Sequence, residues 1–194
     1  MTGVRRVCVY CGSVDRVAEP LRESARRTGR LLAEAGMELI YGGGHIGLMG
    51  LTADAALAAG GHVVGIIPDF LHGREVAHTR VSELVVVGSM HERKQRMLER
   101  ADAFAILPGG LGTLDETFEC MTWKQLGLHD KPIVVVDVAG YWRPLLVLID
   151  HTVAAGFVPV RMRDAIQVVT SAEALIAVLK SAAEPQVQPR PERA

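Results

Sequence analysis

The residues best suited to chemistry lie between Leu107 and Glu116. Three of the four residues from Gly109 to Gly112 are glycines, between an apolar run, 103–107, and a helical pattern. Glycines let backbone N–H groups approach a ligand without interference from Cβ atoms, and the N-terminus of the following helix favours an anion. A phosphate group is therefore the predicted ligand of this turn.

Glu116 follows the glycine turn and is expected in the first turn of the helix. A carboxylate beside a bound phosphate would repel it unless it faces another part of the same ligand, so Glu116 is interpreted as a catalytic group. Alternatively, Asp115 and Glu116 only complement the positive end of the helix dipole. The shape of the motif alone does not decide between these interpretations.

A second candidate group is the adjacent pair Arg93 and Lys94, which follows a capping-box pattern that begins at Ser89. Two cations in the first turn of a helix are electrostatically unfavourable, so we expect a compensating anion nearby. The alternative is a solvated helix face, because Arg93, Arg96 and Arg100 share one side of the helix.

Three motifs together resemble those of the "lonely guy" (LOG) family. Residues 108–116 match its PGGxGTxxE signature, residues 41–50 resemble its second glycine motif, and residues 90–94 resemble its MHxRK motif. One small departure is Asp115, where many plant members have glutamate. The resemblance runs over residues 7–170, and agreement at this spacing is far more specific than a lone glycine pair.

The resemblance implies an enzyme, a cytokinin riboside 5′-monophosphate phosphoribohydrolase. Such a hydrolase cleaves the N-glycosidic bond of adenosine 5′-monophosphate, often modified at N6, to free base and ribose 5-phosphate. Arg93 and Glu116 would be catalytic, and a homodimer is implied. The contacts implied by the resemblance alone are Glu75, Lys94, Thr113 and Thr122. The full expected set of substrate-binding residues is Gly12, Ser13, Gly43, Gly44, Glu75, Met90, Arg93, Lys94, Gly109, Gly110, Leu111, Gly112, Thr113, Leu114, Asp115, Glu116 and Thr122.

The second glycine turn has a rival interpretation. Gly42, Gly44 and Gly47 form a GxGxxG pattern, and Asp69 lies near the position of the ribose-binding acid in a dinucleotide fold. Against this, the turn follows the second expected strand, Asp69 lies in a loop, and one GxGxxG is a weak signal. A non-catalytic mononucleotide- or dinucleotide-binding module is the alternative function.

Some LOG proteins carry the older label "possible lysine decarboxylase", which would require pyridoxal phosphate held by a lysine. None of the four lysines follows a recognisable cofactor motif, so we reject this label and expect no cofactor. The lysines are Lys94, Lys124, Lys131 and Lys180.

The histidines and cysteines predict no metal site. The seven histidines are scattered, without an HExxH motif, and no second CxxC accompanies Cys8 and Cys11. The three-residue offset places these two cysteines on opposite faces of a strand, so both are interpreted as packing residues.

Composition bounds the remaining possibilities. The 194 residues, 49% of them hydrophobic, predict one domain over residues 1–183 and a disordered Pro-rich tail over 184–194. A net charge of −1 argues against nucleic-acid or membrane partners. The expected partner is the small-molecule nucleoside 5′-monophosphate that the resemblance implies. The absence of a long apolar run and the three sparse cysteines predict a cytoplasmic protein.

The elements that must position these residues alternate between strand and helix. We therefore expect an α/β, Rossmann-like three-layer fold, with a doubly wound, mainly parallel sheet and helices on both faces. Ligands bind such sheets at the carboxyl ends of the strands, near a switch in strand order. The expected strands are residues 6–10, 37–41, 62–68, 83–87, 103–107, 132–138 and 165–169. Residues 69–82 are expected to form a loop.

Overall fold

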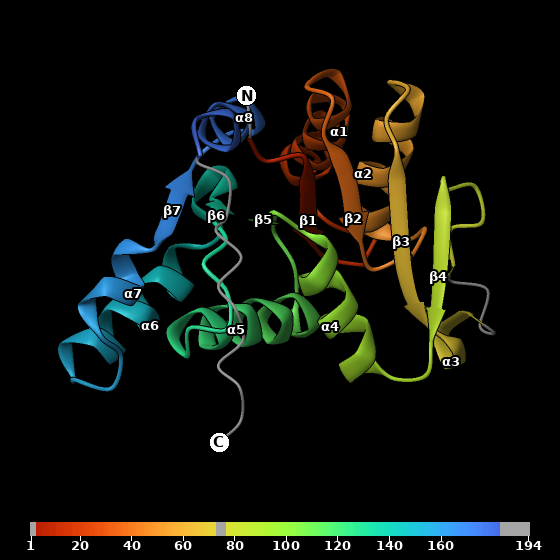
Figure 1. The fold of residues 1–194 in the computed structure, drawn as a ribbon. Helices are drawn as coiled ribbons and strands as arrows, with labels where there is room; N and C mark the ends of the chain where they lie inside the picture. Colours follow the sequence, from red (N-terminus) through yellow and green to blue (C-terminus); the bar gives the residue numbers. More distant parts are fainter. Residues whose placement is uncertain (1–2, 73–76, 183–194) are drawn as a thin grey trace.

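The computed structural model describes residues 3–72 and 77–182. Its strands form one sheet in the order β4-β3-β2-β1-β5-β6-β7, and every neighbouring pair is parallel (Figure 1). This confirms the predicted α/β class. The strands are β1 Arg6–Tyr10, β2 Glu38–Tyr41, β3 Val63–Pro68, β4 Glu83–Val87, β5 Ala103–Ile106, β6 Ile133–Val136 and β7 Ile166–Val169.

The strand order reverses beside β1. The chain builds outward from β1 to β4 and then returns to place β5 on the other side of β1, with Val7 opposite Ala103 and Tyr10 opposite Ile106. The turns that follow β1 and β5 therefore leave the same edge of the sheet side by side. This is the topological switch point, where α/β sheets bind ligands.

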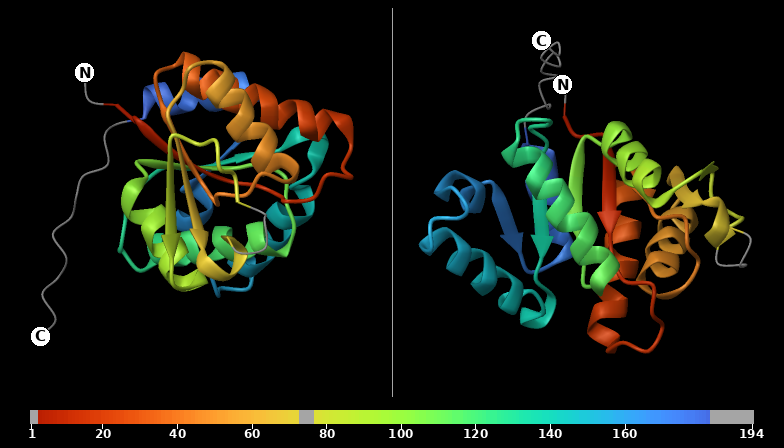
Figure 2. Two further views of the ribbon diagram at one scale, coloured as in Figure 1. Left: turned by 90° about the vertical axis from the view of Figure 1, so that its right-hand side faces the viewer. Right: turned by 90° about the horizontal axis from the view of Figure 1, so that it is seen from below.

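Helices cover both faces of the sheet (Figure 2). On one face lie α1 Glu19–Glu34, α2 Gly47–Ala58 and α8 Ala172–Ser181; on the other lie α4 Met90–Arg100, α5 Leu111–Gln125 and α6 Arg143–Ala154. Successive residues of β1 alternate between the two cores, as a strand requires: Val7 and Val9 pack in one, Cys8 and Tyr10 in the other.

Several expected boundaries were wrong. The segment expected as a loop after β3 begins with a short helix, α3 Asp69–His72, and another short helix, α7 Val160–Asp164, was not foreseen. The strand expected over residues 132–138 ends at Val136, because the Asp137 carboxylate accepts a hydrogen bond from Trp142 N–H at 2.7 Å and turns the chain into η1 Val138–Gly140. The predicted tail over residues 184–194 lies outside the described residues.

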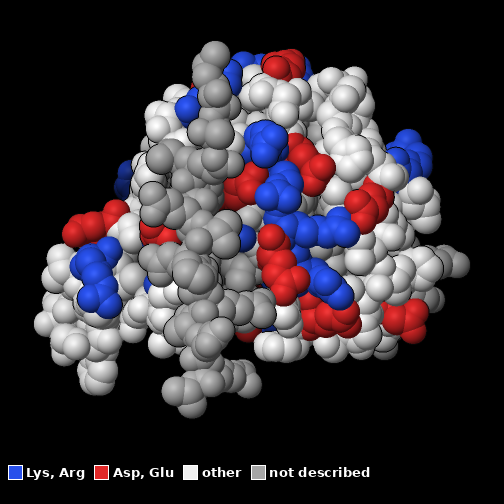
Figure 3. Space-filling view, viewed as in Figure 1, with Lys and Arg blue, Asp and Glu red and all other residues white. Residues whose placement is uncertain are grey.

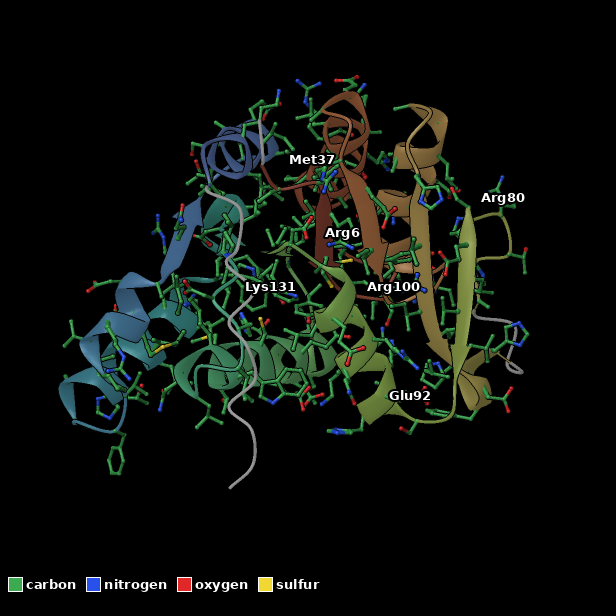
Figure 4. The ribbon with its side chains drawn as sticks, viewed as in Figure 1. Arg6, Met37, Arg80, Glu92, Arg100 and Lys131 are labelled. Atoms are coloured by element: carbon green, nitrogen blue, oxygen red, sulfur yellow. The ribbon has the colours of Figure 1, made fainter. Side chains whose placement is uncertain are left out.

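The surface over α4 carries interspersed charges (Figure 3). Arg100 of α4 pairs with Glu83 at 2.8 Å, and Arg6 pairs with Asp102 at 2.7 Å (Figure 4). Such exposed pairs contribute only about 0–1 kcal/mol each. Among the described residues on this face, acidic side chains lie between the basic ones. Among residues 3–72 and 77–182, no helix is both long and apolar enough to cross a membrane.

Candidate active site

The turns after β1 and β5 touch one another. Gly12 N–H donates to the Pro108 carbonyl at 3.0 Å, and a Cβ on Gly12 would lie 3.2 Å from Gly109 Cα. A Cβ on Gly109 would overlap the Thr113 side chain. The glycines are therefore required by the close approach of two backbones. Together they form a cradle that neither turn could form alone.

The cradle ends at the N-terminus of α5. Gly110 is the N-cap, and no side chain caps the free N–H groups of the first turn. These donors and the helix dipole suit an anion. The helix begins at Leu111, so Glu116 lies in its second turn. The sequence-based expectation that Glu116 lies in the first turn was wrong. Asp115 and Glu116 therefore do not complement the first-turn dipole.

Glu116 has a different partner, the guanidinium of Arg93 on α4. Arg93 Nη1 donates to Glu116 Oε1 at 2.7 Å, and Arg93 Nε donates to the Ile66 carbonyl at 3.0 Å. Each of the two charged side chains is only 8% exposed. Charges buried to this extent are stabilised mainly by each other, and removing either leaves the other uncompensated.

Burial raises the pKa of Glu116 above its ordinary value, and the neighbouring Arg93 opposes this rise. A neighbouring guanidinium by itself lowers the pKa of a carboxyl group. Arg93 acts in that direction, but the loss of hydration on burial outweighs it.

The expected anions beside the cationic pair are all present. Lys94 contacts Asp115 at 3.0 Å and Glu119 at 3.2 Å, while Arg93 contacts Glu116. The solvated-face interpretation is wrong for Arg93, which is buried. It holds for Arg96, whose side chain is 54% exposed.

Arg93 and Glu116 line the same cavity as the glycine cradle. The cavity has a volume of about 520 Å³. Its lining includes expected residues, namely Gly12, Ser13, Arg93, Gly109, Gly110, Leu111, Gly112, Thr113 and Glu116. The other lining residues, which were not among the expected substrate-binding residues, are Cys11, Val14, Val17, Leu21, Leu48, Met49, Leu71, Pro108 and Tyr141. Leu48, Met49 and Pro108 lie within the two glycine motifs, whereas the rest come from separate parts of the chain that no motif had marked.

Several of the expected substrate-binding residues do not line this cavity. Those that the structure describes are Gly43, Gly44, Met90, Lys94, Leu114, Asp115 and Thr122. Leu114 packs against the core, and Thr122 is exposed further along α5, where its hydroxyl donates to the Phe118 carbonyl. Glu75 lies outside the described residues.

The second glycine turn is filled by the protein's own side chains. The Asp15 carboxylate accepts a hydrogen bond from Gly47 N–H at 3.0 Å, at the N-terminus of α2. A Cβ on Gly42 would overlap the Arg93 guanidinium. A dinucleotide phosphate would have to displace Asp15 from this helix end, which weighs against the dinucleotide interpretation.

The cysteines are buried, and the described lysines Lys94 and Lys124 form ion pairs. Cys8 and Cys11 are free and buried in the two opposite cores, which confirms their interpretation as packing residues, and burial raises the pKa of both thiols. No lysine is among the described residues that line the cavity. Within the described ranges, no cluster of three or more His, Cys, Asp or Glu side chains is arranged to hold a metal.

Fold and site together define a Rossmann-like α/β protein with a glycine cradle and a buried Arg–Glu pair at the topological switch point. The family model described as "Possible lysine decarboxylase" matches residues 49–179. Relatives carry a more specific name, and the chain belongs to the LOG family.

Two plant relatives illustrate this similarity. The probable cytokinin riboside 5′-monophosphate phosphoribohydrolase LOGL9 of Oryza sativa subsp. japonica is 49% identical over 80% of this chain and 68% of its own length. The cytokinin riboside 5′-monophosphate phosphoribohydrolase LOG3 of Arabidopsis thaliana is 43% identical over 91% of this chain and 82% of its own length.

Solved structures support the fold alone. The molybdenum cofactor carrier protein of Chlamydomonas reinhardtii is 22% identical and superposes with a TM-score of 0.70, over 91% of this chain and 96% of its own. A molybdenum cofactor binding protein from Rippkaea orientalis is also 22% identical, with a TM-score of 0.69 over 91% of this chain and 96% of its own.

Proposed function

We propose that this protein is a hydrolase that cleaves the N-glycosidic bond of adenosine 5′-monophosphate, or of an N6-modified form of it. The products are the free base, a cytokinin when N6 is modified, and ribose 5-phosphate. One observation carries the proposal: the buried Arg93–Glu116 pair lines the same cavity as the glycine cradle. The names of the plant relatives support the same substrate class.

In this mechanism, the 5′-phosphate binds the N–H groups of residues 110–113 and the Thr113 hydroxyl, assisted by Gly12 and Ser13. Anchoring the phosphate brings the ribose toward Glu116. A water molecule adds its oxygen to C1′ while the bond to the base nitrogen breaks and its electron pair leaves with the base. The Glu116 carboxylate stabilises the oxocarbenium-like ribose and accepts a proton from the attacking water. The leaving base nitrogen takes up a proton from solvent, and Glu116 afterwards releases its proton to solvent, so that the net change is the addition of one water.

Arg93 keeps Glu116 oriented through its hydrogen bond and limits the rise of the carboxylate pKa. Water and two side chains supply this chemistry, so the mechanism uses neither a metal nor a cofactor. The lysine decarboxylase label would need a lysine in the cavity, whereas Lys94 pairs with Asp115 and Glu119 outside the lining.

The direct test incubates the purified protein with AMP and with isopentenyladenosine monophosphate and separates the products by chromatography. Free base and ribose 5-phosphate in equal amounts are expected from at least one substrate. Glu116→Gln should lower turnover by about 10²–10⁴-fold, the usual contribution of acid–base catalysis, and Arg93→Ala should be comparably inactive. A folded Glu116→Gln protein with near-full activity would contradict the mechanism. Nucleotides that bind but survive would instead support a binding module.

We also propose a homodimer. Besides the family resemblance, this rests on α5, where Leu111, Phe118 and Leu126 are 85%, 40% and 66% exposed. Apolar side chains along one helix are a common component of subunit interfaces. Size-exclusion chromatography with light scattering should give twice the 20.9 kDa chain mass, and a monomer at micromolar concentration would contradict the proposal.

Finally, we propose a cytoplasmic location. Cys8, Cys11 and Cys120 are all free and buried, which fits a reducing compartment. Fractionation of cells of the source organism with an antibody against the chain should recover it with cytoplasmic markers. Recovery in a secreted fraction would contradict this location.

A further inference from the structure

Tyr141 contacts the glycine cradle from a separate part of the chain. Its hydroxyl donates to the Gly109 carbonyl at 2.7 Å, and the side chain lines the cavity. The ring packs edge-to-face on Trp142, with centroids 4.9 Å apart, and Trp142 is only 3% exposed. The phenol is therefore held in place by a buried neighbour while its hydroxyl reaches the turn.

The bonded carbonyl belongs to the peptide unit between Gly109 and Gly110. A trans peptide is planar, so its C=O and its N–H point in opposite directions, and fixing one fixes the other. Glycine on both sides gives this unit unusual freedom to rotate. Gly109 is packed against Thr113 and Gly12, but a Cβ placed on Gly110 would meet nothing within 4 Å, so packing restricts the peptide little on the Gly110 side. An external restraint is needed to select one orientation of the Gly110 N–H.

The preceding peptide has its own restraint, because Gly12 N–H donates to the Pro108 carbonyl at 3.0 Å. The following carbonyl, of Gly110, accepts the helical hydrogen bond of Leu114 N–H at 3.0 Å. The carbonyl between these two, of Gly109, accepts the hydrogen bond of the Tyr141 hydroxyl. Three consecutive carbonyls of the cradle are thus anchored by three different elements.

The turn that carries Tyr141 is strained. Ala139 has φ +53° and Gly140 has φ +77°. A non-glycine residue in this left-handed region costs about 1–2 kcal/mol and persists only where its surroundings over-determine it. Here Asp137 supplies the constraint: its N–H donates to the Val169 carbonyl at 2.7 Å, and its carboxylate accepts from Trp142 N–H. The fold tolerates this strain and thereby presents Tyr141 to the cradle.

We propose that Tyr141 is a positioning residue that holds the Gly109–Gly110 peptide in the orientation that binds the substrate phosphate. This inference rests on the proposed function for its substrate, but the contact itself can be tested with phosphate ligands alone. Tyr141 does not touch the reacting atoms. Its contribution lies in the affinity for the phosphate group rather than in bond cleavage.

The test compares Tyr141→Phe with a matched control, Tyr41→Phe. Phenylalanine keeps the ring packing on Trp142 and removes only the hydroxyl. The Tyr41 hydroxyl is buried and has no hydrogen-bond partner among the described residues, so its removal breaks no bond. We expect Tyr141→Phe to raise KM for AMP and Kd for ribose 5-phosphate by about fivefold to tenfold, the usual worth of one hydrogen bond. The turnover of adenosine, which lacks the phosphate, should be unchanged, and Tyr41→Phe should match the wild type.

A second readout is independent of catalysis. In free Tyr141→Phe, the NMR signal of the Gly110 amide should shift or broaden through exchange, whereas Tyr41→Phe should leave it unchanged. If the wild type releases no base, the proposed function fails, but ribose 5-phosphate affinity and the Gly110 signal still test Tyr141. Unchanged affinity together with an unchanged Gly110 signal would overturn the inference. A parallel loss of activity toward AMP and adenosine would overturn it too, because it would indicate a general structural role.

Discussion

The two glycine turns, after β2 and after β5, look equivalent in sequence but serve opposite purposes. After β2, Asp15 occupies the helix N-terminus and Arg93 lies against Gly42, so the missing Cβ atoms make room for the protein itself. After β5, the helix N-terminus has no side-chain cap and faces a cavity of about 520 Å³. A glycine-rich turn is therefore a phosphate site only where the rest of the chain leaves it open.

The largest expected effect comes from adding a side chain to the glycine turn after β2, which the protein's own side chains already fill. Gly42→Ala would place a Cβ on the Arg93 guanidinium and displace it from Glu116. Breaking a buried ion pair typically costs about 3–5 kcal/mol, and loss of the oriented carboxylate should lower kcat by about 10²–10⁴-fold. Denaturant unfolding and steady-state kinetics measure the two effects. Wild-type stability and activity in Gly42→Ala would show that Arg93 is not held against this turn.

The pH dependence of activity tests the buried Glu116 carboxyl, which lines the cavity beside the turn after β5. The proposed mechanism requires ionised Glu116, and the ionised fraction falls as pH falls through the pKa of Glu116. Burial raises this pKa, so the acid limb of kcat/KM should lie above the range of an ordinary glutamate, with activity falling about tenfold per pH unit below it.

A matched variant sharpens this prediction. Asp115 raises the pKa of Glu116 through its negative charge, so Asp115→Asn should move the acid limb to lower pH. A limb that stays in place in Asp115→Asn would assign the titration to another group.

In the turn after β5, a substitution of Gly112 is expected to raise the stability of the fold, by a smaller amount than Gly42→Ala lowers it. A Cβ on Gly112 would meet nothing within 4 Å, and Gly112 lies in the first turn of α5. Gly112→Ala should therefore stabilise the fold by about 0.5–1 kcal/mol, because alanine has the higher helix propensity. The same methyl group should raise KM for AMP by about tenfold, since the residue lines the cavity. Thermal unfolding and kinetics provide the measurements, and an unchanged KM would place the phosphate elsewhere.

The last prediction concerns Asp15 and involves stability and phosphate binding rather than activity. Asp15→Ala removes the acceptor of the Gly47 N–H and should destabilise the protein by about 1 kcal/mol, as loss of a helix cap does. It should also uncover the N-terminus of α2, so millimolar inorganic phosphate should raise Tm more in the variant than in the wild type. An equal response of the two proteins would mean that Asp15 does not occupy an anion site.

The sequence was a good guide to the order of the elements. The largely apolar runs 6–10 and 103–107 were expected as strands, and the structure has strands over Arg6–Tyr10 and Ala103–Ile106, because a strand buried on both faces needs apolar side chains. The errors fell on short or irregular pieces such as α3 and α7, which are too short for a periodic pattern to reveal. The strand ending at Val136 was overextended, because a carboxylate five residues before Trp142 captured a backbone donor.

The sequence by itself determined the α/β class and the glycine turns, whereas Arg93 and Glu116 were singled out by the resemblance of residues 90–94 and 108–116 to the LOG motifs. Local pattern suffices for the class and the turns, because backbone periodicity and glycine spacing act within a few residues. Tertiary structure alone decided which turn is open, that burial outweighs Arg93 in setting the Glu116 pKa, and that Tyr141 reaches the cradle. Asp15 and Gly47 are 32 residues apart, as are Tyr141 and Gly109. Contacts at such separations depend on how the layers pack, and no local pattern encodes them.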